Sequence, residues 1–268
     1  MHPRVSLHQV AFLDQPATTF VEHCRDLGVP MTLVTSLLMQ PGVMDEVCRA
    51  LDSGGPRVSA LNHPFATTTD LERDDGSSTE KRLQAIDLAA ALGARTIYLI
   101  TGGRGALSWE QAAARFAELI APCRVSAETR GVTLLVENAS AFNADIHIAH
   151  TLVDTLALAE QAGIGVCVDL HACWVEATLP TLIERAMPII GLVQVSDYVL
   201  GDRCAPCRAV PGDGAIPLAD LVGDVLSAGY GGLFDLELVG PRITLEGAAA
   251  ATERGLAELS SLLSRLGA

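Results

Sequence analysis

The segment Gly165-Val-Cys-Val-Asp-Leu-His171 places three apolar residues before an aspartate and a histidine. This order is typical of a strand that is buried on both faces and carries polar groups at its C-terminal end. Three more apolar runs lead in the same way into an oxygen-bearing side chain: residues 132–136 before Glu137, 189–193 before Gln194, and 233–236 before Glu237. The sequence therefore predicts four neighbouring strands that direct one acidic or amide side chain each toward a common point.

Short apolar runs alternate with helical patterns along the whole chain. Strands are predicted at residues 5–12, 31–38, 58–61, 96–100, 132–136, 166–168, 189–195 and 233–238. Helices are predicted at residues 18–28, 43–51, 77–93, 108–130, 148–162, 179–186, 218–228 and 245–266. Ser77 with Glu80, and Ser108 with Gln111, have the spacing of capping boxes that begin two of these helices.

Eight strand–helix units in 268 residues indicate a parallel sheet that closes into a (β/α)8 TIM barrel. No linker or shift in composition divides the chain, so residues 1–268 are expected to form one barrel domain. An open, doubly wound sheet is the alternative, but the Gly-x-Gly-x-x-Gly pattern of dinucleotide binding does not follow the first strand. In a barrel, the four polar strand ends would lie on the face that carries active sites.

The charge of the chain argues against several classes of function. The net charge is −14, which disfavours binding to nucleic acid or to anionic membranes. Lys81 is the one lysine and lies in a polar stretch that begins a helix, so Schiff-base and pyridoxal chemistry are not expected. No apolar run is long enough to span a membrane, and a cytoplasmic protein is the default expectation. The seven cysteines are expected to be reduced.

The four strand-end side chains are a plausible ligand set for one metal ion. Adjacent strands lie about 4.8 Å apart, so Glu137, Asp169, Gln194 and Glu237 could meet on a single cation. Three carboxylates that converge without a cation would repel one another, and a divalent ion removes that conflict. An all-oxygen set favours Mg²⁺ or Mn²⁺. The alternative is that each acid caps a helix or pairs with an arginine.

Several other side chains are candidates for binding a substrate. His171 lies two residues after Asp169 and could share its face, while His8 and His63 lie on or at the ends of the first and third strands. Arg208 lies in the loop after the seventh strand and could hold a hydroxyl or carboxylate of the substrate. Ordinary structural roles stay open for each: a hydrogen bond to the backbone for His171, a place in the core with satisfied hydrogen bonds for His8 and His63, and a surface ion pair for Arg208.

Cys204-Ala-Pro-Cys207 has the spacing of a redox motif or of half a zinc site. The pair lies in a loop rather than at the start of a helix, and no second cysteine pair follows it. We therefore predict that neither cysteine binds the metal.

The chain resembles the xylose-isomerase-like barrels, a superfamily of sugar isomerases and epimerases that also holds hydroxypyruvate isomerase, inosose dehydratase and endonuclease IV. The resemblance spans nearly the whole chain and is carried by five short motifs: Leu-Leu-Val-Glu137-Asn, Val-Asp169-Leu-His171, Val-Gln194-Val-Ser-Asp197, Pro-Gly-Asp-Gly214 and Asp-Leu-Glu237. It implies that the four strand-end residues bind one divalent metal, Mn²⁺ or Mg²⁺ with Co²⁺ or Zn²⁺ as alternatives. It also implies that Glu137 and Glu237 form the acid/base pair.

This sequence departs from the family pattern at two positions. The seventh strand usually supplies a histidine, and here it supplies Gln194, as in hydroxypyruvate isomerase. The histidine after the sixth strand usually comes three residues after the aspartate, whereas His171 comes two residues after it, which leaves its role in substrate binding open. The endonuclease branch uses additional histidines; His63 matches one, but the fourth strand ends in Ile100-Thr101-Gly102 without another.

The sequence and the resemblance together predict a metal-dependent isomerase or epimerase of a small sugar or keto-polyol. The reaction would pass through an enediolate, with Glu137 and Glu237 on its two sides. A dehydratase or lyase acting on a keto sugar or inosose is the nearest alternative. A barrel that binds a ligand without turnover, and an endonuclease, come after it. Assembly into a homodimer or homotetramer is left open.

Overall fold

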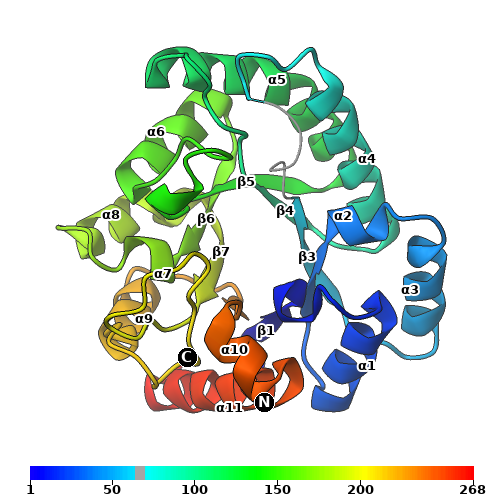
Figure 1. Cartoon of the computed structure of the whole chain (residues 1–268), viewed down its shortest axis with the longest axis vertical. Coiled ribbons are helices and arrows are strands. Elements are labelled where there is room, and N and C mark those ends of the chain that lie inside the picture. The colour runs from blue at the N-terminus through cyan, green and yellow to red at the C-terminus, as the bar shows by residue number, and fades with distance from the viewer. Residues whose placement is uncertain (64–69) are drawn as a thin grey trace.

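A computed structural model describes residues 1–63 and 70–268 of the chain. Its strands are β1 (Val5–His8), β2 (Met31–Val34), β3 (Val58–His63), β4 (Thr96–Leu99), β5 (Thr133–Glu137), β6 (Gly165–Asp169), β7 (Ile190–Val195) and β8 (Phe234–Leu236). Consecutive strands pair in parallel, and β8 pairs in parallel with β1, so the sheet closes on itself (Figure 1). The predicted (β/α)8 barrel is confirmed, and the open-sheet alternative is excluded.

Helices surround the barrel on its outside (Figure 1). They are α1 (Ala17–Leu27), α2 (Thr35–Leu38), α3 (Val43–Asp52), α4 (Ser77–Ala91), α5 (Trp109–Arg130), α6 (Leu152–Ala162), α7 (Leu170–Cys173), α8 (Leu179–Ala186), α9 (Leu218–Ser227), α10 (Pro241–Glu246) and α11 (Ala248–Arg265). Short 3-10 helices lie at Gln9–Phe12, Ala141–Asn143 and Met187–Ile189. Across the described ranges, none of these helices combines the length and apolar character needed to cross a membrane.

The apolar side chains form two layers of core. The larger layer lies between the strands and the helices, and its buried aromatic and aliphatic residues hold the helices against the sheet. A smaller cluster fills the inside of the barrel and consists of Ala60, Tyr98, Leu135, Cys167 and Leu192. Because this inner cluster closes the middle of the barrel, the polar side chains at the C-terminal strand ends form a site above a packed floor.

Two strands are shorter than the apolar runs that predict them. Residues 5–12 form β1 and then a 3-10 helix, because the Nδ1 atom of His8 accepts a hydrogen bond from the backbone N–H of Val10 at 2.9 Å. Residues 31–38 form β2 and then α2, and the Oε1 atom of Gln9 accepts from the N–H of Val34 at 2.9 Å where β2 ends. At both positions a polar side chain binds the backbone where the chain turns.

The predicted helix starts differ in their outcome. The capping box of Ser108 and Gln111 is confirmed at the start of α5. The capping box of Ser77 and Glu80 is wrong, because α4 begins after Gly76, whose backbone is left-handed with φ of 101°, and no side chain caps it. The last predicted helix, residues 245–266, is divided at Gly247 into α10 and α11.

We expect Ser108→Ala to lower the free energy of unfolding by about 1 kcal/mol, because the substitution leaves the backbone N–H of Gln111, in the first turn of α5, without its acceptor. Chemical denaturation monitored by circular dichroism measures the change. The matched control is Ser77→Ala at the start of α4, where the serine caps nothing and a smaller loss is expected. Equal losses in the two variants would contradict the assignment of the cap.

Candidate active site

The four predicted strand-end residues come together at the C-terminal end of the barrel. Glu137 and Asp169 are the last residues of β5 and β6, Gln194 is near the end of β7, and Glu237 follows β8 directly. The β6–β7 register pairs Asp169 with Gln194, and the Nε2 atom of Gln194 donates a hydrogen bond to Glu237. All four are at least nine-tenths buried, so three carboxylates share a site from which water is largely excluded.

Arg208 lies among these carboxylates and supplies the positive charge of the site. Its guanidinium donates to both carboxylate oxygens of Asp169, at 3.1 and 2.7 Å, and to the hydroxyl of Ser196 at 2.9 Å. The same group lies 3.5 Å from a carboxylate oxygen of Glu237. Arg208 is 9% exposed, so the surface ion pair that the sequence left open is excluded, and the arginine is part of the site.

Burial and mutual repulsion disfavour the charged forms of the acids in this cluster. Burial raises the pKa of Glu137 well above its ordinary value, and the charges of Glu237 and Asp169 raise it further. Burial likewise raises the pKa of Glu237 to about 7, although the guanidinium of Arg208 opposes this change. The pKa of Arg208 is raised by Asp169 and Glu237 in spite of its burial, so the arginine stays charged. A positive group added to this site would relieve the remaining repulsion.

The oxygen atoms of this cluster are of the chemical kind that binds a divalent cation. The Oε1 atom of Gln194 is buried and has no hydrogen-bond partner among the described residues, although a buried acceptor ordinarily has one. Carboxylate and amide oxygens are the ligands that Mg²⁺ and Mn²⁺ prefer. Among the described residues, however, no three His, Cys, Asp or Glu side chains converge closely enough to hold an ion. Arg208 engages both oxygens of Asp169 in this arrangement, so binding would require that pair to adjust.

His171 lies at the edge of the site, on α7. Its backbone N–H donates to a carboxylate oxygen of Asp169 at 3.0 Å, so Asp169 also caps this short helix. Its ring meets that of Tyr198 edge-on, with centroids 6.0 Å apart. Burial, followed by the charge of Arg208, lowers the pKa of His171 to about 4. The ring is therefore neutral near pH 7, and its buried Nε2 atom has no protein partner in the described part of the chain.

His8 and His63 are buried at the ends of β1 and β3, and both use ring nitrogens in contacts with the protein. The Nδ1 atom of His63 lies 2.6 Å from the hydroxyl of Thr35. His8 bonds the backbone through Nδ1, and its Nε2 atom bonds the hydroxyl of Tyr98. Burial lowers the pKa of each histidine to about 3, so both rings are neutral.

Asn138 supports the site, although sequence reasoning did not single it out. Its side-chain Nδ2 donates to the carbonyl of Asp169 at 2.9 Å, and its Oδ1 accepts from the N–H of Asp169 at 2.8 Å. This reciprocal pair joins the ends of β5 and β6 and sets the position of the Asp169 carboxylate. The signal available in the sequence was an amide side chain directly after Glu137, at the end of the apolar run of residues 134–136.

Asp197 organises the loop that carries Arg208. Its buried carboxylate accepts four backbone N–H bonds at 2.8 to 3.0 Å, from Tyr198, Gly212, Gly214 and Ile216. A Cβ atom at position 214 would lie 2.3 Å from the Oδ1 atom of Asp197, which explains the glycine of the Pro-Gly-Asp-Gly motif. The motif is therefore a backbone cradle around one carboxylate.

Cys204 and Cys207 lie in the same loop, and Cys207 directly precedes Arg208. Both are free thiols; Cys204 is exposed and Cys207 is half-buried. Their side chains take no part in the cluster of Asp169, Glu237 and Arg208.

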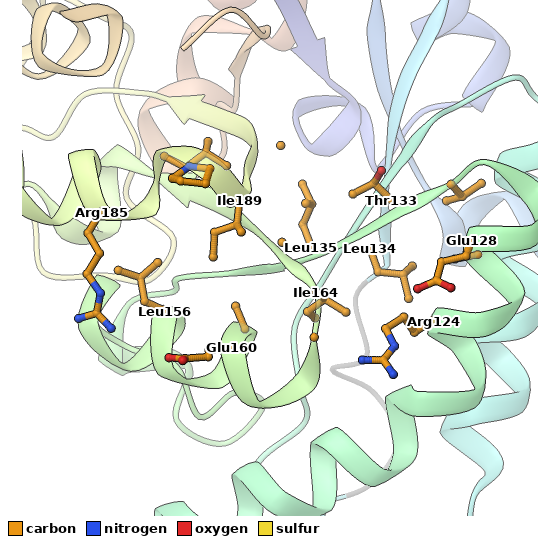
Figure 2. A pocket seen from close by; sticks show the side chains of 18 residues that line it. Arg124, Glu128, Thr133, Leu134, Leu135, Leu156, Glu160, Ile164, Arg185 and Ile189 are labelled. Atoms are coloured by element: carbon orange, nitrogen blue, oxygen red, sulfur yellow. The ribbon is translucent and has the colours of Figure 1, made fainter. Parts of the chain in front are cut away.

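An apolar pocket of about 740 Å³ lies on the opposite end of the barrel from the acidic cluster. Its floor is formed by the starts of β5, β6 and β7, including Leu134, Leu135 and Ile164, and its rim carries Arg124 and Arg185 (Figure 2). Active sites of barrel enzymes lie at the other face, where the strands end. We therefore assign the chemistry to the cluster around Arg208.

Residues 2–262 match the family model described as "Xylose isomerase-like TIM barrel", and the chain belongs to this family. A protein of Streptomyces coelicolor named "Putative hydroxypyruvate isomerase" is 26% identical over 250 residues, which cover 85% of this chain and 86% of that protein. The structure of the IolI protein with a bound zinc atom has a TM-score of 0.82 at 15% identity and covers 98% and 99% of the two chains. An L-ribulose 3-epimerase has a TM-score of 0.78 at 20% identity, with 99% and 96% covered.

We expect Asp197→Ala to lower the free energy of unfolding by about 2–3 kcal/mol, because it leaves N–H groups of the loop without a charged acceptor. Chemical denaturation measures the loss. Asp213→Ala in the same loop is the matched control: Asp213 forms an exposed ion pair with Arg254, for which less than about 1 kcal/mol is expected. If both variants lose equally little stability, the cradle does not hold this loop.

Proposed function

We propose that this protein is a metal-dependent isomerase or epimerase of a small sugar or keto-polyol. The proposal is carried by one observation: Glu137 and Glu237, from β5 and the end of β8, lie in one buried cluster in which Glu237 raises the pKa of Glu137. Two buried carboxylates with raised pKa values can move protons at neutral pH. The names of two relatives, a hydroxypyruvate isomerase and an L-ribulose 3-epimerase, support the same reaction class.

Glu137, Asp169, Gln194 and Glu237 would hold the metal. Their oxygen atoms favour Mn²⁺ or Mg²⁺, while the zinc atom of the IolI structure keeps Zn²⁺ as an alternative. When bound, a divalent cation would polarise the carbonyl group of a keto compound and acidify the neighbouring C–H group. The Oε1 atom of Gln194 has no hydrogen-bond partner among the described residues, so it is the protein atom most directly available to bind that cation.

The two glutamates would divide the proton transfers. One carboxylate removes the proton from the carbon next to the carbonyl group, and the substrate becomes an enediolate. The other glutamate, in its protonated form, returns a proton, and the choice of carbon and face decides between isomerisation and epimerisation. The pKa of Glu237, about 7, lies where an acid/base group is most effective at neutral pH.

Arg208 and His171 would orient the substrate beside these glutamates. The guanidinium of Arg208 can donate to a hydroxyl or carboxylate oxygen as well as to Asp169. His171 is neutral, and its buried Nε2 atom has no hydrogen-bond partner among the described residues, so it can form a hydrogen bond with a substrate hydroxyl. His171 lies on α7, directly after β6, and Arg208 lies in the loop after β7. Both positions are at the face where barrel enzymes bind substrates.

We expect the wild-type protein with Mn²⁺ to exchange deuterium from D₂O into at least one member of a panel of ketoses, inososes and small keto acids. Glu237→Gln should lower this turnover by about 100-fold or more, because it keeps the size of the side chain and removes the base. Proton NMR follows the exchange. If the substrate is an epimer pair, Glu137→Gln should affect the two epimers unequally, because each presents its proton to a different glutamate.

The control for these variants is Glu118→Gln, which changes an exposed glutamate on α5 and should leave turnover unchanged. A Glu237→Gln protein that turns over at the wild-type rate would contradict the two-glutamate mechanism. Loss of water from a panel compound, rather than isomerisation, would move the assignment to a dehydratase that uses the same site.

We also expect the purified protein to bind one divalent metal per chain and to lose activity on chelation. Gln194→Leu should weaken metal binding by roughly 10-fold or more, since removal of even an indirect partner of a metal site has effects of that size. Cys204→Ser with Cys207→Ser should leave the metal content unchanged. Mass spectrometry measures the metal content of the wild type and of both variants. Full activity in metal-free wild-type protein would refute the dependence of activity on metal.

A further inference from the structure

Tyr98 crosses the inside of the barrel beneath the acidic cluster. It lies on β4, is fully buried, and packs in the inner cluster with Leu135 and Cys167. Its hydroxyl bonds the Nε2 atom of His8, which ends β1. In the closed barrel β1 pairs with β2 and β8 and not with β4, so this contact joins two strands that are not neighbours. The Tyr98 side chain therefore forms part of the floor of the site.

The direction of this hydrogen bond follows from the other contact of His8. The Nδ1 atom of His8 accepts from the N–H of Val10 at 2.9 Å, so Nδ1 carries no proton. Burial keeps the ring neutral, with a pKa of about 3, so its one proton is on Nε2. Nε2–H must then donate to the oxygen of Tyr98, and the proton of the Tyr98 hydroxyl is left for a different acceptor.

Within the described residues, the Tyr98 hydroxyl has no other hydrogen-bond partner. A buried hydroxyl donor without an acceptor is unfavourable, so this proton is available to an acceptor oxygen that enters the site. Sequence reasoning could not identify this unused donor, because Tyr98 lies within an apolar run and looks like an ordinary core residue of β4.

The spare donor lies next to the two glutamates of the proposed reaction. Tyr98 pairs with Leu135 in the β4–β5 register, and Glu137 follows two residues later on the same face of β5. Leu7 pairs with Leu236 in the β1–β8 register, so His8 and Glu237 are the next residues on their two strands. After burial, the charges of Glu237 and Glu137 are the largest causes that raise the pKa of Tyr98, so its hydroxyl keeps its proton.

We propose that the Tyr98 hydroxyl donates a hydrogen bond to an oxygen of the bound keto compound, and that His8 is the positioning residue that sets its direction. The inference rests on the proposed function and deepens it. It requires a substrate with an acceptor oxygen at the floor of the site, beside the carbon that loses its proton. The bond strengthens as that oxygen gains negative charge in the enediolate.

The test compares binding of glycolohydroxamate, a small analogue of an enediolate, to the Mn²⁺-loaded wild-type protein and to Tyr98→Phe. We expect the dissociation constant to rise by about 10- to 100-fold in Tyr98→Phe, because a hydrogen bond to a charged oxygen is lost. Tyr230→Phe is the matched control: Tyr230 is also buried, but its hydroxyl donates to the carbonyl of Leu233 at 2.7 Å, away from the cluster. Thermal unfolding checks that each variant is folded.

Two variants of His8 separate positioning from simple packing. His8→Gln keeps an N–H donor for Tyr98, and its affinity for glycolohydroxamate should stay closer to wild type than that of His8→Leu. Adding Tyr98→Phe to His8→Leu should cause no further loss beyond Tyr98→Phe alone, because His8 acts through the tyrosine. Full additivity of the two losses would overturn the positioning role.

A measurement on the wild-type protein tests the direction itself. Nitrogen-15 NMR of the histidine rings should show His8 with its proton on Nε2, and a proton on Nδ1 would overturn the inference. Wild-type binding by a folded Tyr98→Phe protein would overturn it as well, as would wild-type protein that does not bind glycolohydroxamate. The proposed function is tested separately, by deuterium exchange in the wild type. Weakened binding in Tyr98→Phe supports the donor whatever the result of that exchange.

Discussion

Arg208 is the countercharge on which the buried carboxylates of this barrel depend. Three acids lie at the ends of β5, β6 and β8 with little access to water, and isolated buried carboxylates are strongly unfavourable. The guanidinium holds Asp169 through two hydrogen bonds and lies within ion-pair distance of Glu237. Burial raises the pKa values of Glu137 and Glu237, and neighbouring carboxylates raise them further, because one arginine does not balance three acids. The binding of a metal ion or of protons would relieve this remaining imbalance.

The arrangement of Arg208 and Asp169 depends in turn on two groups that bind the backbone around them. The carboxylate of Asp197 accepts hydrogen bonds from the backbone of the loop after β7. These bonds fix the loop that carries Arg208. Asn138 holds the backbone of Asp169 from the side of β5. The geometry of the acidic cluster therefore depends on the carboxylate of Asp197 and the amide of Asn138, which bind backbone groups. This explains why the sequence motifs include residues beyond the acids of the cluster.

The acidic cluster was the part of the site that the sequence predicted best, because each of its acids directly follows a run of apolar residues. That signal is local: a buried strand and the polar side chain after it are adjacent in the chain. The role of Arg208 stayed undecided because its partner Asp169 is distant in the sequence. Asn138, and the contact between Tyr98 and His8, were missed for the same reason. The false capping box at Ser77 shows the opposite error, where local spacing suggests a contact that the backbone at Gly76 does not form.

The sequence by itself determined the class of architecture and the end of the barrel at which the polar residues gather. Alternating strand and helix patterns require parallel strands, and parallel strands bring all their C-terminal ends to one face. Only the tertiary structure decided how those polar groups pair. Closure of the sheet brings Tyr98 of β4 to His8 of β1, and the loop after β7 places Arg208 against Asp169. Hydrogen bonds and ion pairs depend on distances of a few ångströms, and between residues remote in the chain those distances exist only after the barrel has closed.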